Sequence, residues 1–321
     1  MMKAILAVAT DNGVSVLKPG QEATDYVLSA RGLVGRGSGC VARTGDGKLA
    51  AGTKDFFVQL SPDGMEWKAS LDGIARPHIT SLGRHPKHKH LLFAGSSPPA
   101  VYMSADYGAS WTAMAPLESL PNADRWTYPE APYRAKVTSV ICHGEHNGVV
   151  FCSIENGGVA ASKDGGKTWM PRSTGLPPSV RQLAFSSKHA NRVYAATSTG
   201  FYISEDLGAS WQERNQGLPF TRVESMAVAE QNPDIVLLSV AQGVKGPWTI
   251  VMSKDAGQSW SVANVGLPRL DSRAVTSVIF GTGGFFAATD QGEIFFLNNL
   301  EGRWIQVATG LGAIRAIMTL A

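Results

Sequence analysis

The stretch Ser162-Lys163-Asp164-Gly165-Gly166-Lys167-Thr168-Trp169 decides the fold, because its pattern Ser-x-Asp-x-Gly-x-Ser/Thr-Trp recurs along the chain. Complete copies span Ser104–Trp111, Ser162–Trp169, Ser204–Trp211 and Ser253–Trp260. A copy shortened by one residue ends at Trp67 and a degenerate copy ends at Trp304. Successive tryptophans are therefore 44, 58, 42, 49 and 44 residues apart, a spacing typical of a repeat architecture.

The residue types of this motif predict a structural turn. The Asp carboxylate can accept hydrogen bonds from backbone N–H groups of the turn, and Gly supplies the backbone conformation that the turn needs. The Trp can bury a large apolar area between neighbouring sheets. We therefore expect these turns to hold hairpins together, and we expect no catalytic role for their Asp residues.

Short strands surround each turn. A β-branched run such as 137–141 or 275–279 comes first, a second run such as 285–289 follows, and the motif then separates a third strand from a fourth. Gly-Leu-Pro closes three of the units, at 175–177, 217–219 and 266–268. Four short strands per unit predict one blade of a β-propeller.

The predicted fold is a single all-β domain over residues 1–321, a seven-bladed propeller. Six complete blades fall at roughly 34–74, 76–121, 134–177, 178–219, 220–268 and 270–311. Residues 4–33 supply only the later strands of a seventh blade, and residues 313–320 form a lone inner strand. Pairing the two termini closes the ring and removes an exposed sheet edge. The alternative is six blades with the N-terminal segment added at an edge.

The repeat resembles the Asp-box, or bacterial neuraminidase repeat, of sialidase-like β-propellers, over almost the whole chain. Arg76-Pro77-His78, the Trp126-x-x-Pro129 insertion and the segment Ile154–Val159 make it similar to small bacterial proteins labelled glycosyl hydrolase or sialidase-like. The resemblance implies that the blade-to-blade crossovers and the hairpins between second and third strands share one face. The Asp-box turns then lie on the other face. Neither Arg-Ile-Pro nor Arg-Leu-Pro occurs, so classical sialidase activity is not expected.

Each predicted crossover carries an arginine; these are Arg36, Arg76, Arg134, Arg181, Arg222, Arg273 and Arg315. Period-two alternation places His78 with Thr80, Lys136 with Thr138, and Arg222 with Glu224 on the strand face that lines the central funnel. Guanidinium groups there would bind a carboxylate, sulfate or phosphate. The alternative is that the arginines form rim salt bridges with Glu130, Glu155, Glu224 and Asp271.

Glu155 and His78 are the predicted catalytic pair, because a carboxylate and an imidazole can move protons near neutral pH. The predicted substrate-binding residues are Arg76, Arg134, Arg181, Arg222, Arg273, Arg315, Trp126, Tyr128 and Trp248. Trp126 and Tyr128 belong to an insertion over 115–134, and loops on a rigid scaffold often carry function. For the aromatic residues the alternative is simple packing, and for Glu155 and His78 it is turn stabilisation or pairing with arginine.

The other histidines are predicted to lie in solvated turns on the opposite face, and their spacing fits no zinc pattern; they are His85, His88, His90, His143, His146 and His189. Cys40, Cys142 and Cys152 lie in apolar runs and are predicted to be buried reduced thiols. We expect neither a metal nor another cofactor.

The charge balance disfavours nucleic acid as a partner. Lys and Arg number 29 against 26 Asp and Glu, a net charge of +3, with no long basic run. No apolar stretch is long enough to cross a membrane, and the N-terminus lacks a signal-peptide core, so we expect a cytoplasmic protein.

Two functions stay open at this point. One is a hydrolase or lyase acting on an anionic sugar-acid or aromatic-acid substrate in the funnel. The other is a non-catalytic scaffold that binds a protein or peptide partner through the same face, since propellers host both.

Overall fold

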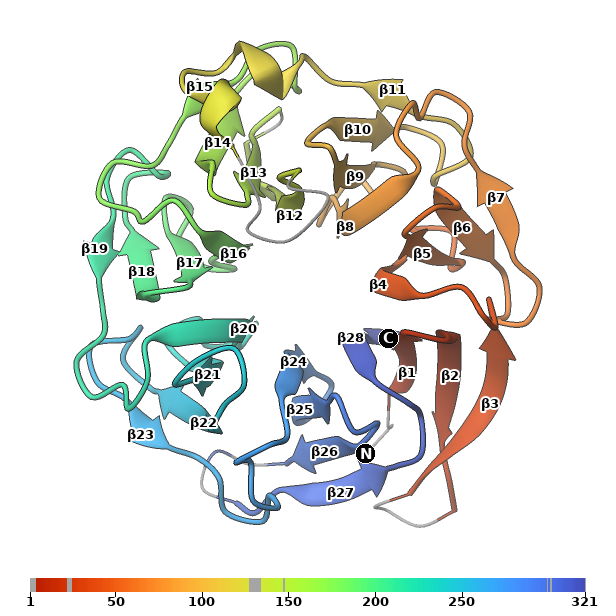
Figure 1. The fold of residues 1–321 in the computed structure, drawn as a ribbon, viewed down its shortest axis with the longest axis vertical. Helices are drawn as coiled ribbons and strands as arrows, with labels where there is room; N and C mark the ends of the chain where they lie inside the picture. Colours follow the sequence, from red (N-terminus) through yellow and green to blue (C-terminus); the bar gives the residue numbers. More distant parts are fainter. Residues whose placement is uncertain are drawn as a thin grey trace.

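The computed structural model describes residues 4–21, 25–126, 134–146, 148–298, 300 and 302–320. Within them the chain forms seven four-stranded antiparallel sheets, arranged as a ring of blades around a central axis (Figure 1). The closing blade contains β28 (Ile314–Leu320), β1 (Ile5–Thr10), β2 (Gly13–Pro19) and β3 (Tyr26–Gly32). Blade 1 contains β4 (Ser38–Arg43), β5 (Leu49–Thr53), β6 (Val58–Ser61) and β7 (Lys68–Ser70).

The next blades follow in chain order. Blade 2 contains β8 (His78–Arg84), β9 (Leu92–Ser97), β10 (Val101–Ser104) and β11 (Thr112–Ala113), and blade 3 contains β12 (Val137–Cys142), β13 (Val150–Ile154), β14 (Gly158–Ser162) and β15 (Met170–Pro171). Blade 4 contains β16 (Val180–Phe185), β17 (Val193–Thr197), β18 (Gly200–Ser204) and β19 (Gln212–Glu213).

Blades 5 and 6 complete the ring. Blade 5 contains β20 (Arg222–Val228), β21 (Val236–Ala241), β22 (Trp248–Ser253) and β23 (Ser261–Val262), and blade 6 contains β24 (Val275–Gly281), β25 (Gly284–Thr289), β26 (Ile294–Leu297) and β27 (Ile305–Ala308). Two short 3-10 turns, η1 (Leu117–Ser119) and η2 (Ala123–Arg125), lie in the insertion between blades 2 and 3. The described part of the chain has no helix long and apolar enough to span a bilayer.

The two ends of the chain meet in one sheet, as predicted. β28 pairs antiparallel with β1, with Ile5 opposite Leu320 and Val8 opposite Ile317. β28 is the innermost strand of this blade, and β1 to β3 follow outward (Figure 1). The seven-bladed prediction is therefore confirmed, and the six-bladed alternative is wrong.

Threonines of the predicted β-branched runs join neighbouring inner strands. Each hydroxyl donates to a backbone carbonyl of the next blade: Thr80 to Val137 at 2.6 Å, Thr138 to Val180 at 2.7 Å, and Thr276 to Ile314 at 2.8 Å. Gln182 takes this place in blade 4, donating to the Met226 carbonyl and accepting from its N–H. Repeated polar residues on the inner strands thus hold the ring together around the axis.

The recurring motif forms the turn that its residues predict. In blade 3, the Ser162 hydroxyl accepts from Gly166 N–H at 2.7 Å, and the Asp164 carboxylate accepts from Thr168 N–H at 2.9 Å. The copies ending at Trp111, Trp211 and Trp260 have the same bonds. Each of these tryptophans then reaches the preceding blade; Trp211, for example, donates to the Arg172 carbonyl at 2.8 Å.

The motif also makes the folded protein less stable at acidic pH. Hydrogen bonds from Thr168 and Ser162 lower the pKa of Asp164 from 3.8 to about 2. Because the folded carboxylate binds a proton less tightly than the unfolded one, its contribution is complete above about pH 4 and is lost as pH falls toward 2. Between pH 4.5 and pH 2, we expect the melting temperature of Asp164→Asn to fall less than that of the parent protein. Thermal melts followed by circular dichroism measure both. Equal losses would contradict this role for the carboxylate.

Two of the histidines differ from the prediction of solvated turns. His85 and His143 are only 4% and 3% exposed. The Nδ1 of His143 accepts backbone N–H groups of Glu145 and His146, both at 2.9 Å, and His85 holds its own turn in the same way. The remaining four, His88, His90, His146 and His189, are exposed as predicted. No group of three metal-ligating side chains occurs in the described ranges.

The three cysteines are free thiols. Cys142 and Cys152 are buried, and Cys40 is half-buried. Burial raises the pKa of the Cys142 thiol to about 12, which leaves it protonated and unreactive near neutral pH. The prediction of reduced thiols is confirmed, with Cys40 less buried than expected.

Candidate functional site

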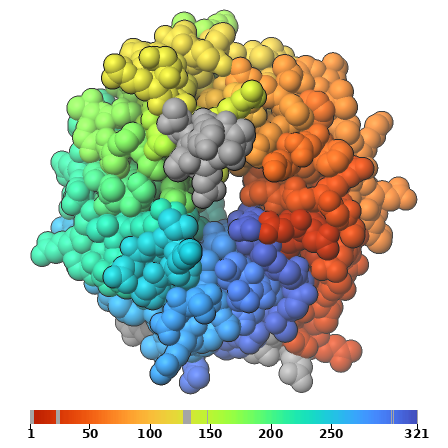
Figure 2. Space-filling view, viewed as in Figure 1, coloured from red at the N-terminus to blue at the C-terminus, as the bar shows by residue number. Residues whose placement is uncertain are grey.

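A central cavity is the strongest candidate site. The ring leaves an opening at its centre (Figure 2). Around it lies a cavity of about 490 Å³, to which each of the seven blades contributes a residue. Its charged or titratable lining residues are Asp11, Lys54, His78, Lys136, Arg181, Glu224 and Arg315. Thr80 also lines it, so His78, Thr80, Lys136 and Glu224 lie where strand alternation placed them. Thr138 and Arg222, which alternation assigned to the same face, do not line the cavity.

The two arginines that line this cavity, Arg181 and Arg315, form ion pairs with carboxylates, as does Arg222 beside it. Arg181 Nη1 lies 2.9 Å from Glu224 Oε2, and Arg222 Nε lies 2.5 Å from Glu224 Oε1. Arg315 Nη2 lies 2.5 Å from Asp11 Oδ2, an ion pair that also lowers the pKa of Asp11. Arg315 thus binds Asp11 through both Nε and Nη2, whereas Arg181 is paired through Nη1 and its buried Nε has no hydrogen-bond partner among the described residues.

The other predicted arginines lie outside the cavity lining. Arg273 pairs with Glu293 at 2.5 Å, and Arg76 pairs with Glu118 of η1 at 2.6 Å. Arg134 is exposed on the approach to blade 3. Of the six arginines predicted to bind substrate, two line the cavity (Arg181 and Arg315) and four do not (Arg76, Arg134, Arg222 and Arg273), and the substrate-binding role of all six remains a prediction.

The alternative prediction, that the crossover arginines form salt bridges, is correct for Arg76, Arg181, Arg222, Arg273 and Arg315. Of its four proposed acidic partners, Glu224 is confirmed. Glu155 and Asp271 form no ion pair among the described residues, and Glu130 lies outside them. The actual partners include Asp11, Glu118 and Glu293, which come from hairpins and the insertion.

Positive charge is concentrated on the side of blades 1 to 3. Lys54 of blade 1, His78 of blade 2 and Lys136 before blade 3 all line the cavity, and no carboxylate among the described residues of these blades does. Burial lowers the pKa of His78, and the charges of Lys136 and Lys54 lower it further, while Asp55 acts in the opposite direction. The imidazole is therefore neutral near pH 7, in a positive local potential.

The described residues of the lining carry excess positive charge. Four permanently cationic side chains, Lys54, Lys136, Arg181 and Arg315, face two carboxylates. Sequence reasoning missed Lys54, although it lies in the hairpin of blade 1 that corresponds to the Glu155 hairpin of blade 3. Aligning the equivalent hairpins of the blades would have indicated that Lys54 lies at the cavity.

The predicted catalytic pair does not converge in this cavity. His78 lines it and Glu155 does not. Glu155 lies in the hairpin between β13 and β14, where its backbone N–H donates to the Lys136 carbonyl at 2.9 Å. The acid–base role of the pair remains a prediction.

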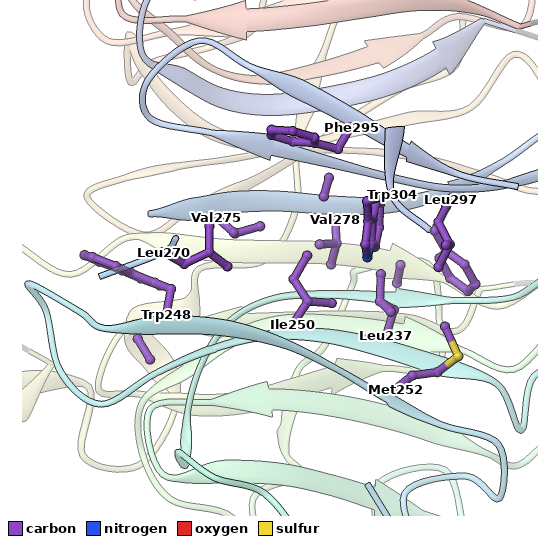
Figure 3. Close-up of a cluster of buried hydrophobic side chains, with 14 of the residues drawn as sticks. Leu237, Trp248, Ile250, Met252, Leu270, Val275, Val278, Phe295, Leu297 and Trp304 are labelled. Carbon is purple, nitrogen blue, oxygen red and sulfur yellow. The ribbon is translucent and has the colours of Figure 1, made fainter. Parts of the chain in front are cut away.

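The aromatic residues predicted to bind substrate are mainly packed against the protein core. Trp248 is 9% exposed and packs with Leu270 and Val275 in the core between blades 5 and 6 (Figure 3), as the packing alternative predicts. Its contact with a ligand remains a prediction. Trp126 is partly buried against the core of blade 3. Tyr128 lies outside the described residues.

Comparisons with known proteins support the propeller fold. A family model described as the DUF6242 beta propeller domain matches residues 121–265, which is less than half of the chain. No curated protein matches.

Among solved structures, an ancestral GH74 enzyme is similar with a TM-score of 0.63 and 13% identity over 83% of this chain. This chain spans only 37% of that enzyme. The WD40 beta propeller domain of Doa1 has a TM-score of 0.60 and 16% identity, covering 86% of this chain and 84% of that one. YCF48 bound to D1 peptide has a TM-score of 0.57 and 16% identity, covering 83% of this chain and 79% of that one. These likenesses concern the fold, and Asp-box membership remains a prediction.

Proposed function

We propose that this protein is a non-catalytic binding module whose central funnel receives an acidic segment of a protein partner. The observation that carries this proposal is the excess of cationic side chains lining the cavity, concentrated on blades 1 to 3. A propeller of similar fold, YCF48, has been solved with a peptide bound, which makes a peptide ligand reasonable for this architecture.

The chemistry of the cavity favours a flexible polyanion. Both arginines of the lining already form ion pairs with carboxylates, so their positive charge is less available to a single small anion. Lysine ammonium groups on flexible stems can adapt to several carboxylates of an extended chain. A volume of about 490 Å³ suffices for a few residues of such a chain.

Replacing the two lysines tests this function. We expect Lys54→Gln/Lys136→Gln to weaken binding of fluorescein-labelled acetyl-hexaglutamate about tenfold to hundredfold, because two charge-assisted contacts are lost. Fluorescence anisotropy measures the change, with labelled hexaglutamine as the uncharged probe. We also expect binding by the parent protein to weaken with added salt.

A matched control has the same change of net charge. Lys163→Gln/Lys167→Gln alters two exposed lysines in the repeat turn of blade 3, on the face opposite the cavity. This control should bind hexaglutamate within about twofold of the parent protein, since screened charges at a distance contribute little. Equal weakening in both double variants would show that the funnel has no specific role and would overturn the proposal.

The hydrolase or lyase reading has its own test. It requires turnover of an acidic glycoside, a uronate or an aromatic acid that depends on Glu155. Glu155→Gln keeps the shape of the side chain and removes its proton-accepting charge. Turnover by the parent protein that disappears in Glu155→Gln would overturn the non-catalytic proposal in favour of an enzyme.

A further inference from the structure

A rigid hairpin of blade 1 holds an aromatic ring out toward solvent. Phe56 is 43% exposed, in the turn between β5 and β6. The Phe56 N–H donates to Thr53 Oγ1 at 3.1 Å, and the Thr53 hydroxyl donates to the Phe57 carbonyl at 2.8 Å. These bonds hold the backbone of the turn from which the Phe56 side chain extends toward solvent.

The same turn contains backbone strain. Phe57 has φ of 60°, a left-handed conformation that a bulky residue rarely adopts. Asn156, in the corresponding hairpin of blade 3, has φ of 54°, which costs less for its residue type. Strain of this kind is often found where a loop is shaped for a ligand.

An arginine covers this ring. The Arg36 guanidinium carbon lies 4.3 Å from the centre of the Phe56 ring, a cation–π contact. Val34, two residues earlier in the crossover between β3 and β4, is 65% exposed. Val34, Arg36 and Phe56 form the blade 1 platform. Within the described part of the chain, Arg36 is in no ion pair, so its charge is not neutralised by a bound carboxylate.

The blade 1 platform adjoins the funnel. Gly37 and Gly39, directly after Arg36, line the central cavity together with Lys54, which is two residues before Phe56. The Gly35 N–H donates to Asn12 Oδ1 at 2.8 Å, which ties this crossover to the hairpin that carries Asp11. A chain bound on the lysine side of the funnel can therefore contact the blade 1 platform where it leaves the cavity.

We propose that the blade 1 platform binds an aromatic side chain that lies between acidic residues of the partner segment. Phe56 and Val34 supply apolar surface, while Arg36 and Lys54 supply positive charge that complements the flanking carboxylates. This inference rests on the proposed function and adds the sequence class of the partner: an acidic segment that contains an aromatic residue.

Two peptides of equal charge test the blade 1 platform. They are labelled acetyl-Glu-Glu-Glu-Phe-Glu-Glu-amide and the same peptide with Ala in place of Phe. We expect the parent protein to bind the Phe peptide about fivefold to tenfold more tightly, as is usual for burying one aromatic ring on a partly exposed surface. Phe56→Ala should remove this preference and leave the affinity for the Ala peptide unchanged.

Controls separate the platform from the funnel. Ile305→Ala removes an exposed apolar side chain of β27, on the outer strand of blade 6, and should keep the full preference. Lys54→Gln/Lys136→Gln should weaken both peptides and keep their ratio. Arg36→Lys retains the charge but loses the planar stacking, so it should reduce the preference. Thermal melts confirm that each variant is folded.

Each outcome has a distinct meaning. If the parent protein binds both peptides equally, the blade 1 platform is overturned and the acidic funnel stands. If it binds neither, the proposed function fails as well. If folded Phe56→Ala still prefers the Phe peptide over the Ala peptide, the aromatic side chain of the peptide binds elsewhere, and the inference is overturned.

Discussion

Removal of residues 314–320 is expected to abolish cooperative folding of this protein. These residues form β28, the inner strand of the closing blade, which pairs with β1. The deletion exposes the edge of β1 and removes the side chains of Ile314 and Ile317, both fully or almost fully buried. It also removes the carbonyl that accepts from Thr276 of blade 6.

The expected loss is large relative to total stability. Burial of two isoleucines contributes about 3–6 kcal/mol, and domains are stable by only about 5–15 kcal/mol. Size-exclusion chromatography and circular-dichroism melts measure the outcome as aggregation and the absence of a sharp transition. A truncated protein that stays monomeric and melts like the parent would contradict closure of the ring through β28.

A point variant covers the case in which the truncated chain cannot be purified. Ile317→Ala is expected to cost about 2–5 kcal/mol, because it leaves a cavity between β28 and the adjacent inner strands. Met318→Ala changes the neighbouring, half-buried residue and should cost less. Equal costs would indicate that the inner face of β28 is not packed as described.

Trp304→Ala is expected to cost about 3–5 kcal/mol of unfolding free energy. The ring is 2% exposed and lies between blades 5 and 6 (Figure 3), and its Nε1 donates to the Ala263 carbonyl at 2.7 Å. The variant leaves a cavity and an unpaired carbonyl. Urea unfolding followed by circular dichroism measures the change.

Trp67 offers the matched comparison. It occupies the same position in the shortened motif, but it is only half-buried and donates to Gly64 of its own turn at 3.0 Å. Trp67→Ala should therefore cost clearly less than Trp304→Ala. Similar costs would contradict the view that the tryptophans stabilise the ring by joining adjacent blades.

The repeat made most of the fold predictable. The motif sets the turn and the tryptophan that joins neighbouring blades, and the β-branched runs give the inner strands. Alternation along those strands assigned six residues to the cavity; His78, Thr80, Lys136 and Glu224 line it, and Thr138 and Arg222 do not. These features depend on local periodicity, which a single sequence contains in full.

The ionic partners were less predictable, because they depend on side-chain reach between segments far apart in the chain. Arg76 pairs with Glu118, and Arg315 pairs with Asp11 at the other end of the chain. No spacing rule relates such residues. Glu224 was the exception, since it lies two residues from Arg222 on the same strand face.

The buried histidines show a different limit. His85 and His143 use a ring nitrogen to accept backbone N–H groups, the role that the Ser186 hydroxyl takes in the equivalent turn of blade 4. A histidine in a polar turn ordinarily suggests solvent exposure. Comparing the three equivalent turns with one another would have indicated a structural acceptor at that position.

The position of the bound ligand is tested most directly by the ring resonances of His78. The pKa of this imidazole is lowered by burial and by Lys136 and Lys54, so a carboxylate bound beside them must raise it. We expect NMR titration of His78, assigned with a His78→Gln variant, to give a higher pKa when acetyl-hexaglutamate saturates the protein. The ring resonances of the exposed His189, on the opposite face, should not move when the peptide is added at constant pH. A His78 pKa that does not change under saturating peptide would place the ligand outside the funnel and contradict the account.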